Sequence, residues 1–367
     1  MKVTSVKVTP HANALSRRMG EAHAPAGRLT EHCCVVELMT DVGLTGIAIG
    51  DEAAITSIEG LVSDVLVGAD PRGVRSLWQR MANVQMAKRR GHRLHDAIAA
   101  LDVALWDLKS KANDEPLWKT LGGTRPKANA YASGIDLALS DEEMSAWYAR
   151  MARDYGLRGG KLQVGRDRIS DLQRLGQMRA ALMQGTPEPV LMIDADESWS
   201  PKEAIRRTRE MEEHFDLAWI EGAARDWDFP GLKQVSSAVR AAVCVGEGFA
   251  TVGEFLPHFH HRSADVIQID IGAIGITGAL QLADAAFGYE LPVALSAAPG
   301  NIHAHLAGVM PYFMSLEVID PIPAEQFYTT DVRIEQGWAI AGDAPGNGLA
   351  VTLKAITATA TRAKQMK

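Results

Sequence analysis

Four short apolar segments of this chain each end in an acidic residue, and they follow one another at nearly even intervals. The acids are Asp194, Glu221, Glu247 and Asp270, separated by 27, 26 and 23 residues. Each interval is about the length of one strand plus one helix. The carboxyl ends of all strands in a parallel barrel meet at one mouth, where active sites are built. The pattern therefore predicts a parallel barrel with several carboxylates at its mouth.

These carboxylates would repel one another strongly unless a cation held them. Hard oxygen ligands that leave room for water and substrate suit Mg²⁺, so the acids predict a magnesium site acting on a carboxylate-bearing substrate. In the alternative interpretation each acid only caps the helix after its strand, as single Asp residues at such turns often do. Three acids at successive strand ends favour the metal site.

Length and charge restrict the function further. The 367 residues suffice for a barrel of about 200 to 250 residues and a second, smaller unit. The net charge of −7 argues against a nucleic-acid partner. The cysteines Cys33, Cys34 and Cys244 have no ligand spacing and indicate buried thiols in a reducing compartment. We find neither a signal sequence nor an apolar run expected to span a bilayer, so we expect a cytoplasmic protein without a membrane partner.

The first 125 residues have the pattern of an α+β unit. Alternation over residues 2–10 predicts a strand, and residues 33–38 and 43–49 predict a hairpin. Residues 13–30 are polar and rich in small side chains, which we interpret as a mobile loop. Helical periodicity then dominates residues 55–121, and a Gly-Gly-Thr-Arg-Pro turn follows it.

From residue 126 to 321 strands and helices alternate, which favours a (β/α) barrel over an open sheet. Residues 322–367 return to turns and short strands, which we expect to complete the N-terminal unit. Amphipathic helices are predicted between the strands, for example at 142–155, 172–183 and 201–214. The eight predicted strands are 129–133, 160–164, 190–194, 218–221, 243–246, 266–270, 292–296 and 314–317.

Several motifs occur in a specific order along the chain. They are Asp102-Val-Ala-Leu-Trp-Asp-Leu-Lys with Leu121-Gly-Gly, Asp194-Ala-Asp-Glu-Ser-Trp, Trp219-Ile-Glu, Gly246-Glu, Gln268-Ile-Asp270 with Gly275-Ile-Thr, and Pro345-Gly-Asn-Gly. Over nearly its whole length the chain thereby resembles the mandelate racemase/muconate lactonizing enzyme branch of the enolase superfamily. The resemblance implies an α+β capping domain over a modified (β/α)₇β barrel.

The resemblance also implies a chemistry. Asp194, Glu221 and Glu247 would bind one Mg²⁺, and the shared step of the family would remove the proton α to a carboxylate and stabilise the resulting enediolate on the metal. This agrees with the interpretation of the acids themselves, because a metal neutralises charge that develops on carboxylate oxygens while a nearby base takes the proton.

The chain departs from the family where the bases are expected. Lys161 matches the first lysine of the family's Lys-x-Lys, but Gln163 replaces the second, and an amide is not a usable base near neutral pH. On the opposite side Asp270 is present, whereas Ser296 lies where the family's histidine is expected. Lys161 is therefore the strongest remaining base, and His303 is a candidate for a displaced one.

Other residues are candidates for binding the substrate. Gln163 and Ser296 would contact it in the mouth, and Glu317 would accept a hydrogen bond from a substrate hydroxyl. Cations and imidazoles of the loops could close over its distal end: Arg17, Arg18, His23, His92 and Arg93. The histidines at 258, 260 and 261 resemble a metal-binding run, but we expect them on a helix surface away from the mouth.

The leading hypothesis is a Mg²⁺-dependent dehydratase of an acid sugar, because dehydration needs fewer bases than racemisation. A racemase or cycloisomerase of a hydroxy acid or lactone is the alternative within the enzymes. A barrel that binds metal and ligand but has lost catalysis is the alternative outside them. The expected partner is a small-molecule carboxylate, and related barrels often assemble into homo-oligomers.

Overall fold

The structure is a computed structural model that describes residues 1–88, 93–322 and 327–352. Its centre is a closed barrel of eight parallel strands, in which β11 pairs with β4 to complete the ring. The strands, in order around the barrel, are β4 (Lys127–Ser133), β5 (Gly159–Gln163), β6 (Val190–Asp194), β7 (Leu217–Glu221), β8 (Ala242–Val245), β9 (Val266–Ile269), β10 (Val293–Leu295) and β11 (Phe313–Val318). All eight agree with the predicted strands within two residues at each end.

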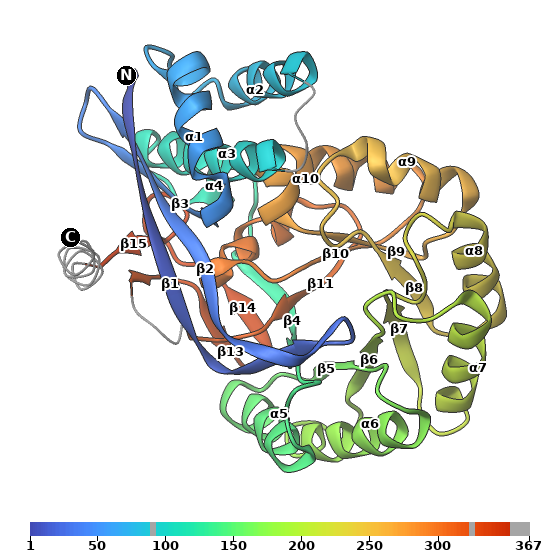
Figure 1. Ribbon diagram of the computed structural model, residues 1–367. Helices are drawn as coiled ribbons and strands as arrows, with labels where there is room; N and C mark the ends of the chain where they lie inside the picture. Colours follow the sequence, from blue (N-terminus) through green and yellow to red (C-terminus); the bar gives the residue numbers. More distant parts are fainter. Residues whose placement is uncertain (89–92, 323–326, 353–367) are drawn as a thin grey trace, which may run out of the picture.

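Helices surround the barrel between successive strands (Figure 1). They are α5 (Asp141–Tyr155), α6 (Arg168–Leu182), α7 (Pro201–Glu212), α8 (Phe229–Ala238), α9 (Val252–His261) and α10 (Ile271–Gly288). Local signals start them: Ser140 and Glu143 form a capping box at α5, and Ser200 caps α7, which begins with Pro201. After β10 the 3₁₀ segments η3 (Pro299–His305) and η4 (Ala307–Val309) replace a helix. The prediction of a modified barrel is confirmed.

The N-terminal unit consists of a three-stranded antiparallel sheet and several helices, as predicted. The predicted hairpin lies within β2 and β3, which pair from Cys33↔Asp51 to Met39↔Thr45. The elements of the unit are β1 (Val3–Glu21), β2 (Ala24–Thr40), β3 (Thr45–Asp51), η1 (Glu52–Ala54), α1 (Ile55–Leu61), η2 (Val62–Leu66), α2 (Val74–Lys88), α3 (Arg93–Ala112) and α4 (Leu117–Thr120).

The prediction of a mobile loop at residues 13–30 is wrong. These residues are the outer half of a long hairpin in which β1 and β2 pair up to Glu21↔Ala24. Figure 1 shows this hairpin, in blue, extending from the capping helices to the ends of β5 and β6. Its tip is bonded to the barrel, because Gly20 N donates to Ile135 O at 2.8 Å and Leu137 N to Gly20 O at 3.0 Å. Residues 12–18 are partly exposed on both faces, so they lack the apolar alternation that identifies a strand.

Helix α3 of the capping unit is joined to α10 of the barrel by a buried hydrogen-bond network. Asp102 accepts from both the backbone N and the Oγ1 of Thr277 at 2.7 Å, and Trp106 Nε1 donates to the same hydroxyl at 3.0 Å. Gly275 has φ +73° at a kink in α10, and a β-carbon there would lie 2.9 Å from Asp102 Oδ2. The network therefore stabilises the kink at Gly275, which lies near the start of α10.

The C-terminal segment contacts both units. Within it β14 (Trp338–Ile340) pairs with β4 of the barrel and with β13 (Arg333–Glu335), while β12 (Tyr328–Thr329) pairs with β15 (Ala350–Val351). Asn347 N donates to Asp107 Oδ1 of the capping helix at 2.8 Å. A domain division at residue 125, with a capping domain completed from about residue 322, stays a proposal. Residues 353–367 lie outside the described residues.

Among the described residues, α10 is the one helix whose length and apolar composition would allow it to cross a membrane. In this structure 61% of that window is buried. It packs against α3 and the barrel strands β9 and β10, as core helices of barrels do.

Candidate active site

Inward-pointing side chains at the carboxyl ends of β5, β6 and β7 form the floor of the barrel mouth. Gln163, Asp194 and Glu221 occupy neighbouring positions across these strands. Lys161 lies two residues before Gln163 and so faces the same way, because side chains alternate along a strand. Glu247 follows β8 after Gly246, whose φ of +124° and close approach to the Gln268 main-chain oxygen leave no space for a β-carbon. This turn brings Glu247 to the same mouth.

The three predicted metal ligands come together. One carboxylate oxygen each from Asp194, Glu221 and Glu247 lie within 4.8 Å of one another. Asp194 and Glu221 are buried, and Glu247 is exposed at the rim. Asp194 accepts hydrogen bonds from Gln163 Nε2 at 2.8 Å and from Asp196 N at 2.9 Å. Glu221 Oε1 is buried without any hydrogen-bond partner in the protein, as expected for an oxygen that binds a cation.

Lys161 is bonded to the acids that surround it. Its Nζ lies 2.7 Å from Glu221 Oε2, 3.0 Å from Glu317 Oε1 and 3.5 Å from Asp194 Oδ2, and its side chain is 2% exposed. Burial alone would lower the pKa of Lys161, but the charges of Glu221 and Glu317 outweigh it and raise the pKa well above its ordinary value. In the same way burial would raise the pKa of Glu317, whereas Lys161 holds it below its ordinary value.

These residues line a cavity of about 310 Å³ that we call the acid cavity. Lys161 is the only lysine or arginine among its described lining residues. Burial, the main cause, and the charge of Asp194 raise the pKa of Glu221 to about 7, although Lys161 opposes the shift. The eight acids of the lining are Glu21, Asp194, Asp196, Glu197, Glu221, Asp226, Glu247 and Glu317. This excess of carboxylates and the unpartnered Glu221 oxygen fit a bound dication with hard oxygen ligands.

Asp270 lies at the start of α10, beside a second cavity of about 730 Å³. Its Oδ1 accepts a hydrogen bond from Gly272 N at 2.7 Å and so caps the helix. Burial raises the pKa of Asp270 to about 6. Ser296, at the position expected for the family's histidine, is buried, and its Oγ has no hydrogen-bond partner. The carboxylate of Asp270 therefore lines the larger cavity directly, with no histidine side chain between the two.

His303 lines neither of the two cavities. This histidine is fully buried in η3, and its Nε2 donates to the main-chain oxygen of Glu317 at 3.0 Å. Burial lowers the pKa of His303 to about 4. Its bond to the end of β11 indicates a structural role, and nothing in this geometry supports it as the displaced base.

Arg17 is likewise occupied by contacts within the protein. Its guanidinium donates to Gly134 O at 2.7 Å and to Asp320 Oδ1 at 3.0 Å, and it stacks on Trp147 at 4.3 Å. These bonds fasten the long hairpin to the ends of β4 and β11, so Arg17 is not free to bind a substrate. His23 is exposed at the hairpin turn, and its backbone N donates to Asp196 Oδ2 at 2.9 Å.

The remaining candidates differ in their positions. Gln163 and Glu317 line the acid cavity, whereas Arg18 is exposed and donates to Ala26 O at 3.3 Å. His92 lies outside the described residues, as does the side chain of Arg93. The three histidines near residue 260 belong to α9, outside both cavities, but His258 is buried and not on the helix surface as predicted.

Sequence reasoning missed several residues of the site. Glu197 and Asp226 line the acid cavity from the loops after β6 and β7, and burial together with the charge of Glu197 raises the pKa of Asp226 to about 7. The run Asp194-Ala-Asp-Glu carried a signal for Glu197, because it continues the acidic strand end. Asn13 was hidden in the supposed loop and Glu31 directly follows that loop, and both line the larger cavity.

Comparisons with known families agree with this geometry. The family model of the mandelate racemase/muconate lactonizing enzyme N-terminal domain matches residues 8–122. The family model described as enolase C-terminal domain-like matches residues 143–355. The two matches cover the capping unit and most of the barrel.

Individual relatives have different activities. L-talarate/galactarate dehydratase of Salmonella typhimurium is 28% identical over 278 residues, covering 74% of this chain and 69% of the relative. A 3,6-anhydro-alpha-L-galactonate cycloisomerase of Streptomyces coelicolor is 33% identical over 228 residues, covering 62% of each. The crystal structure of a racemase from Streptomyces coelicolor with bound magnesium superposes with a TM-score of 0.88 at 25% identity, covering 97% of this chain and 99% of the racemase.

Proposed function

This chain belongs to the mandelate racemase/muconate lactonizing enzyme branch of the enolase superfamily, and from that membership we propose that it is a Mg²⁺-dependent enzyme that dehydrates an acid sugar. The shared step would be removal of the proton α to the substrate carboxylate. The single observation that carries the proposal is the convergence of Asp194, Glu221 and Glu247 within 4.8 Å in a cavity lined by eight acids.

In this proposal those three carboxylates hold one Mg²⁺. When bound, the cation supplies positive charge beside the substrate carboxylate, which makes the α proton more acidic. Gln163 supports the arrangement by orienting Asp194 through its amide at 2.8 Å. The crystallised racemase with bound magnesium supports the identity of the metal.

We assign Lys161 the role of a hydrogen-bond donor rather than that of the base expected from the sequence. In the metal-free protein three carboxylates within 3.5 Å of its Nζ favour the ammonium form. Glu317, at 3.0 Å, is not a proposed metal ligand, so its charge still favours the ammonium form when Asp194 and Glu221 hold the cation. In that form the lysine donates hydrogen bonds to negative charge that develops on the substrate carboxylate, and it cannot accept a proton.

Asp270 is then the proposed base. One of its oxygens caps α10, and the carboxylate reaches the larger cavity with a pKa of about 6. A base with a pKa near the working pH is an efficient proton acceptor. After Asp270 accepts the α proton, it can return that proton to the departing β-hydroxyl, which leaves as water. The resulting enol rearranges to the 2-keto-3-deoxy acid, so one base is sufficient for the whole dehydration.

Cycloisomerisation is the second candidate. The Streptomyces coelicolor cycloisomerase is 33% identical to the chain, compared with 28% for the talarate/galactarate dehydratase. Both reactions begin with loss of a proton α to a carboxylate, so they share the metal and base proposed here. A racemase is less favoured, because it needs a base on each face of the α carbon and only Asp270 is available among the described candidates.

The partner in this proposal is a small carboxylic acid, in keeping with the acids named in the activities of the two relatives. We further propose a cytoplasmic homo-oligomer without nucleic acid or membrane partners. The net charge of −7 argues against a nucleic-acid partner, and the three buried free cysteines fit a reducing compartment.

The test is a screen of sugar acids with the Mg²⁺-loaded protein and with the same protein in EDTA. We expect a 2-keto acid to accumulate only with Mg²⁺, and Asp270→Asn to slow its formation by about 10² to 10⁴. Isomerised acid without a 2-keto product would support the cycloisomerase instead. Ligand-induced thermal stabilisation without any product would show a barrel that binds ligand but has lost catalysis.

A further inference from the structure

The larger cavity adjoins the acid cavity and extends beneath the long hairpin. Ile135 lines both cavities, and Gly248 of the larger one follows Glu247 of the other. Ala297 also lines the larger cavity, and its N donates to Glu317 Oε2 at 3.1 Å. A substrate whose carboxylate lies in the acid cavity would therefore extend its distal end into the larger one.

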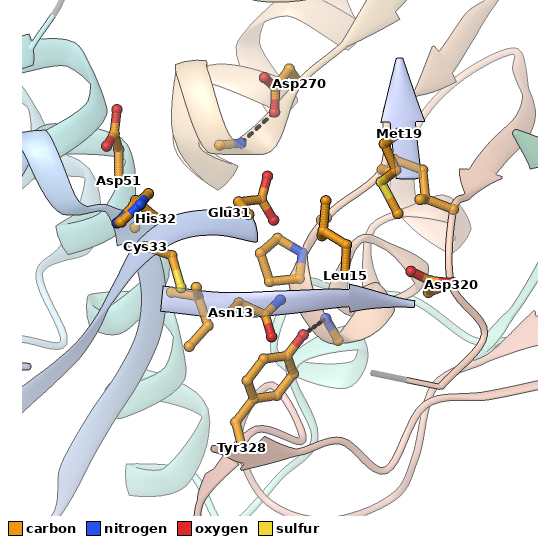
Figure 2. A pocket seen from close by; sticks show the side chains of 18 of the residues that line it. Asn13, Leu15, Met19, Glu31, His32, Cys33, Asp51, Asp270, Asp320 and Tyr328 are labelled. Atoms are coloured by element: carbon orange, nitrogen blue, oxygen red, sulfur yellow. Dashed lines mark hydrogen bonds between the residues drawn. The ribbon is translucent and has the colours of Figure 1, made fainter. Parts of the chain in front are cut away.

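The walls of the larger cavity come from three parts of the chain (Figure 2). Asn13 and Glu31 are cross-strand partners on the hairpin, and Figure 2 shows both beside the cavity with Asp270 above them. Tyr328 belongs to the C-terminal segment, and its hydroxyl accepts a hydrogen bond from Gly300 N at 3.1 Å. The cavity is therefore shaped jointly by the capping unit, the barrel and the tail.

Among the described residues of these walls, acidic side chains outnumber basic ones. The acids that line the cavity are Glu31, Asp51, Asp96, Asp270 and Asp320, and the basic side chains among the described lining residues are Arg28 and His32. His32 Nδ1 lies 2.9 Å from Glu52 Oε2. Arg28 NH2 lies 3.8 Å from Glu31 Oε1, beyond hydrogen-bond distance, and both side chains are about half exposed, so the Glu31 carboxylate can still accept hydrogen bonds from a ligand.

A further acceptor in this cavity is unsatisfied. Asn13 Oδ1 is buried and has no hydrogen-bond partner in the protein. A buried acceptor of this kind costs free energy unless a donor reaches it. Because Asn13 faces Glu31 across the hairpin, the two side chains offer neighbouring acceptor oxygens to the same ligand.

We propose that this cavity selects acid sugars with one carboxylate and a neutral, hydroxylated tail, and discriminates against diacids. The proposal rests on the proposed function, because it takes the metal site as the place of the first carboxylate. Tail hydroxyls donate to Asn13 Oδ1 and to the Glu31 carboxylate. A second carboxylate in the same place would instead meet Glu31 and Asp270 with like charge and leave Asn13 without a donor. Glu31 is thus the specificity-determining residue.

The experiment compares aldonates with aldarates of the same chain length and configuration, in a panel of several configurations. The probes are added to the Mg²⁺-loaded protein, and both kcat/KM and ligand-induced thermal stabilisation are measured. For the aldonate–aldarate pair that binds best, we expect kcat/KM of the aldonate to exceed that of the aldarate by about tenfold or more. Glu31→Gln should narrow this ratio and Glu31→Arg should reverse it. Glu37→Gln is the matched control on the same strand, because Glu37 pairs with Lys7 and does not line the cavity.

Binding distinguishes a failure of this inference from a failure of the proposed function. If no acid is turned over, a stabilisation that favours the aldonate and depends on Glu31 still supports the selectivity. Equal or tighter binding of the aldarate would overturn it, and so would a ratio that does not change in the Glu31 variants. Absence of binding by every member of the panel would also overturn it.

Discussion

Lys161 Nζ lies 2.7 Å from Glu221 Oε2, so the only described lysine of the acid cavity is bonded to one of the three proposed metal ligands. The ammonium group reduces the repulsion among the carboxylates that surround it. Because a bound dication would act on the same carboxylates, the stability of the protein should depend jointly on Lys161 and on the metal.

Replacing Lys161 by Gln should destabilise the metal-free protein by about 3 to 5 kcal/mol, the usual cost of breaking a buried ion pair. With saturating Mg²⁺ the loss should be clearly smaller, since the cation neutralises the same carboxylates. Urea unfolding in EDTA and in Mg²⁺ measures both values. An equal loss in the two conditions would show that Lys161 and the metal do not share these carboxylates.

Glu221→Gln should abolish most of the stabilisation by Mg²⁺. A ligand at 100 times its Kd stabilises a protein by about 2.7 kcal/mol, and this increment should disappear when one of three charged ligands becomes neutral. Melting temperatures with and without Mg²⁺ test the expectation. Glu188→Gln, on an exposed loop, is the control and should respond to Mg²⁺ like the unmodified protein. A full Mg²⁺ response in Glu221→Gln would place the ion elsewhere.

Asp270→Asn should lower kcat by about 10² to 10⁴, the usual contribution of a general base. Since Asn also caps helices well, the free energy of unfolding should hardly change. In the unmodified enzyme kcat/KM should rise with pH through the Asp270 pKa of about 6, because only the ionised carboxylate accepts a proton. Asp167→Asn alters the cap of α6 and should leave activity intact. A variant with full activity would exclude Asp270 as the base.

Arg17→Ala should detach the tip of the hairpin from the barrel. The change removes hydrogen bonds to Gly134 O and Asp320, and it leaves Asp320 Oδ1 with only the Ser16 hydroxyl as a donor, at a cost of about 3 kcal/mol or more. KM should rise as well, because the hairpin forms one wall of the larger cavity. Arg18→Ala is the matched control, with an expected effect within about 0.5 kcal/mol. Denaturant unfolding and steady-state kinetics measure both effects. A similar loss of stability and a similar rise in KM in the two variants would contradict the assigned role of Arg17.

Asp102 should make the protein less stable as the pH rises from about 4 to 7. Burial raises its pKa from 3.8 to about 7 in the folded state, although hydrogen bonds from Thr277 oppose the shift. Between these values the native state binds the extra proton, so the stability present at low pH is progressively lost, by an amount on the order of 4 kcal/mol. Asp102→Asn cannot ionise and should flatten this slope in urea unfolding measured across the pH range. An unchanged slope would show that Asp102 does not titrate there.

The barrel strands and their terminal acids were predictable because each depends on a local pattern. A buried parallel strand is a short apolar run, and Asp194 and Glu221 end such runs directly. The hairpin was not predictable in this way. Its outer half is partly exposed on both faces, so residues 13–30 carry no alternation, and their strand conformation depends on pairing and on the bonds of Gly20 to the barrel.

The site residues show the same difference between features that depend on a local pattern and features that depend on tertiary contacts. The carboxylate trio followed from spacing, whereas the roles of Arg17 and His303 did not. Arg17 contacts Gly134 and Asp320, which are 117 and 303 residues away in the chain. No local pattern reveals that such partners have used up its hydrogen-bond donors.

The amino-acid sequence by itself determined the alternation of strands and helices, the position of each acid at a strand end and the absence of the usual second lysine and histidine. The tertiary structure alone decided that Lys161 is paired with two of the proposed metal ligands, that Arg17 fastens the hairpin and that Asn13 and Glu31 face a shared cavity. The physical reason is that strand and helix patterns arise from neighbours along the chain. The charge state and availability of a side chain depend instead on partners that only the fold brings close.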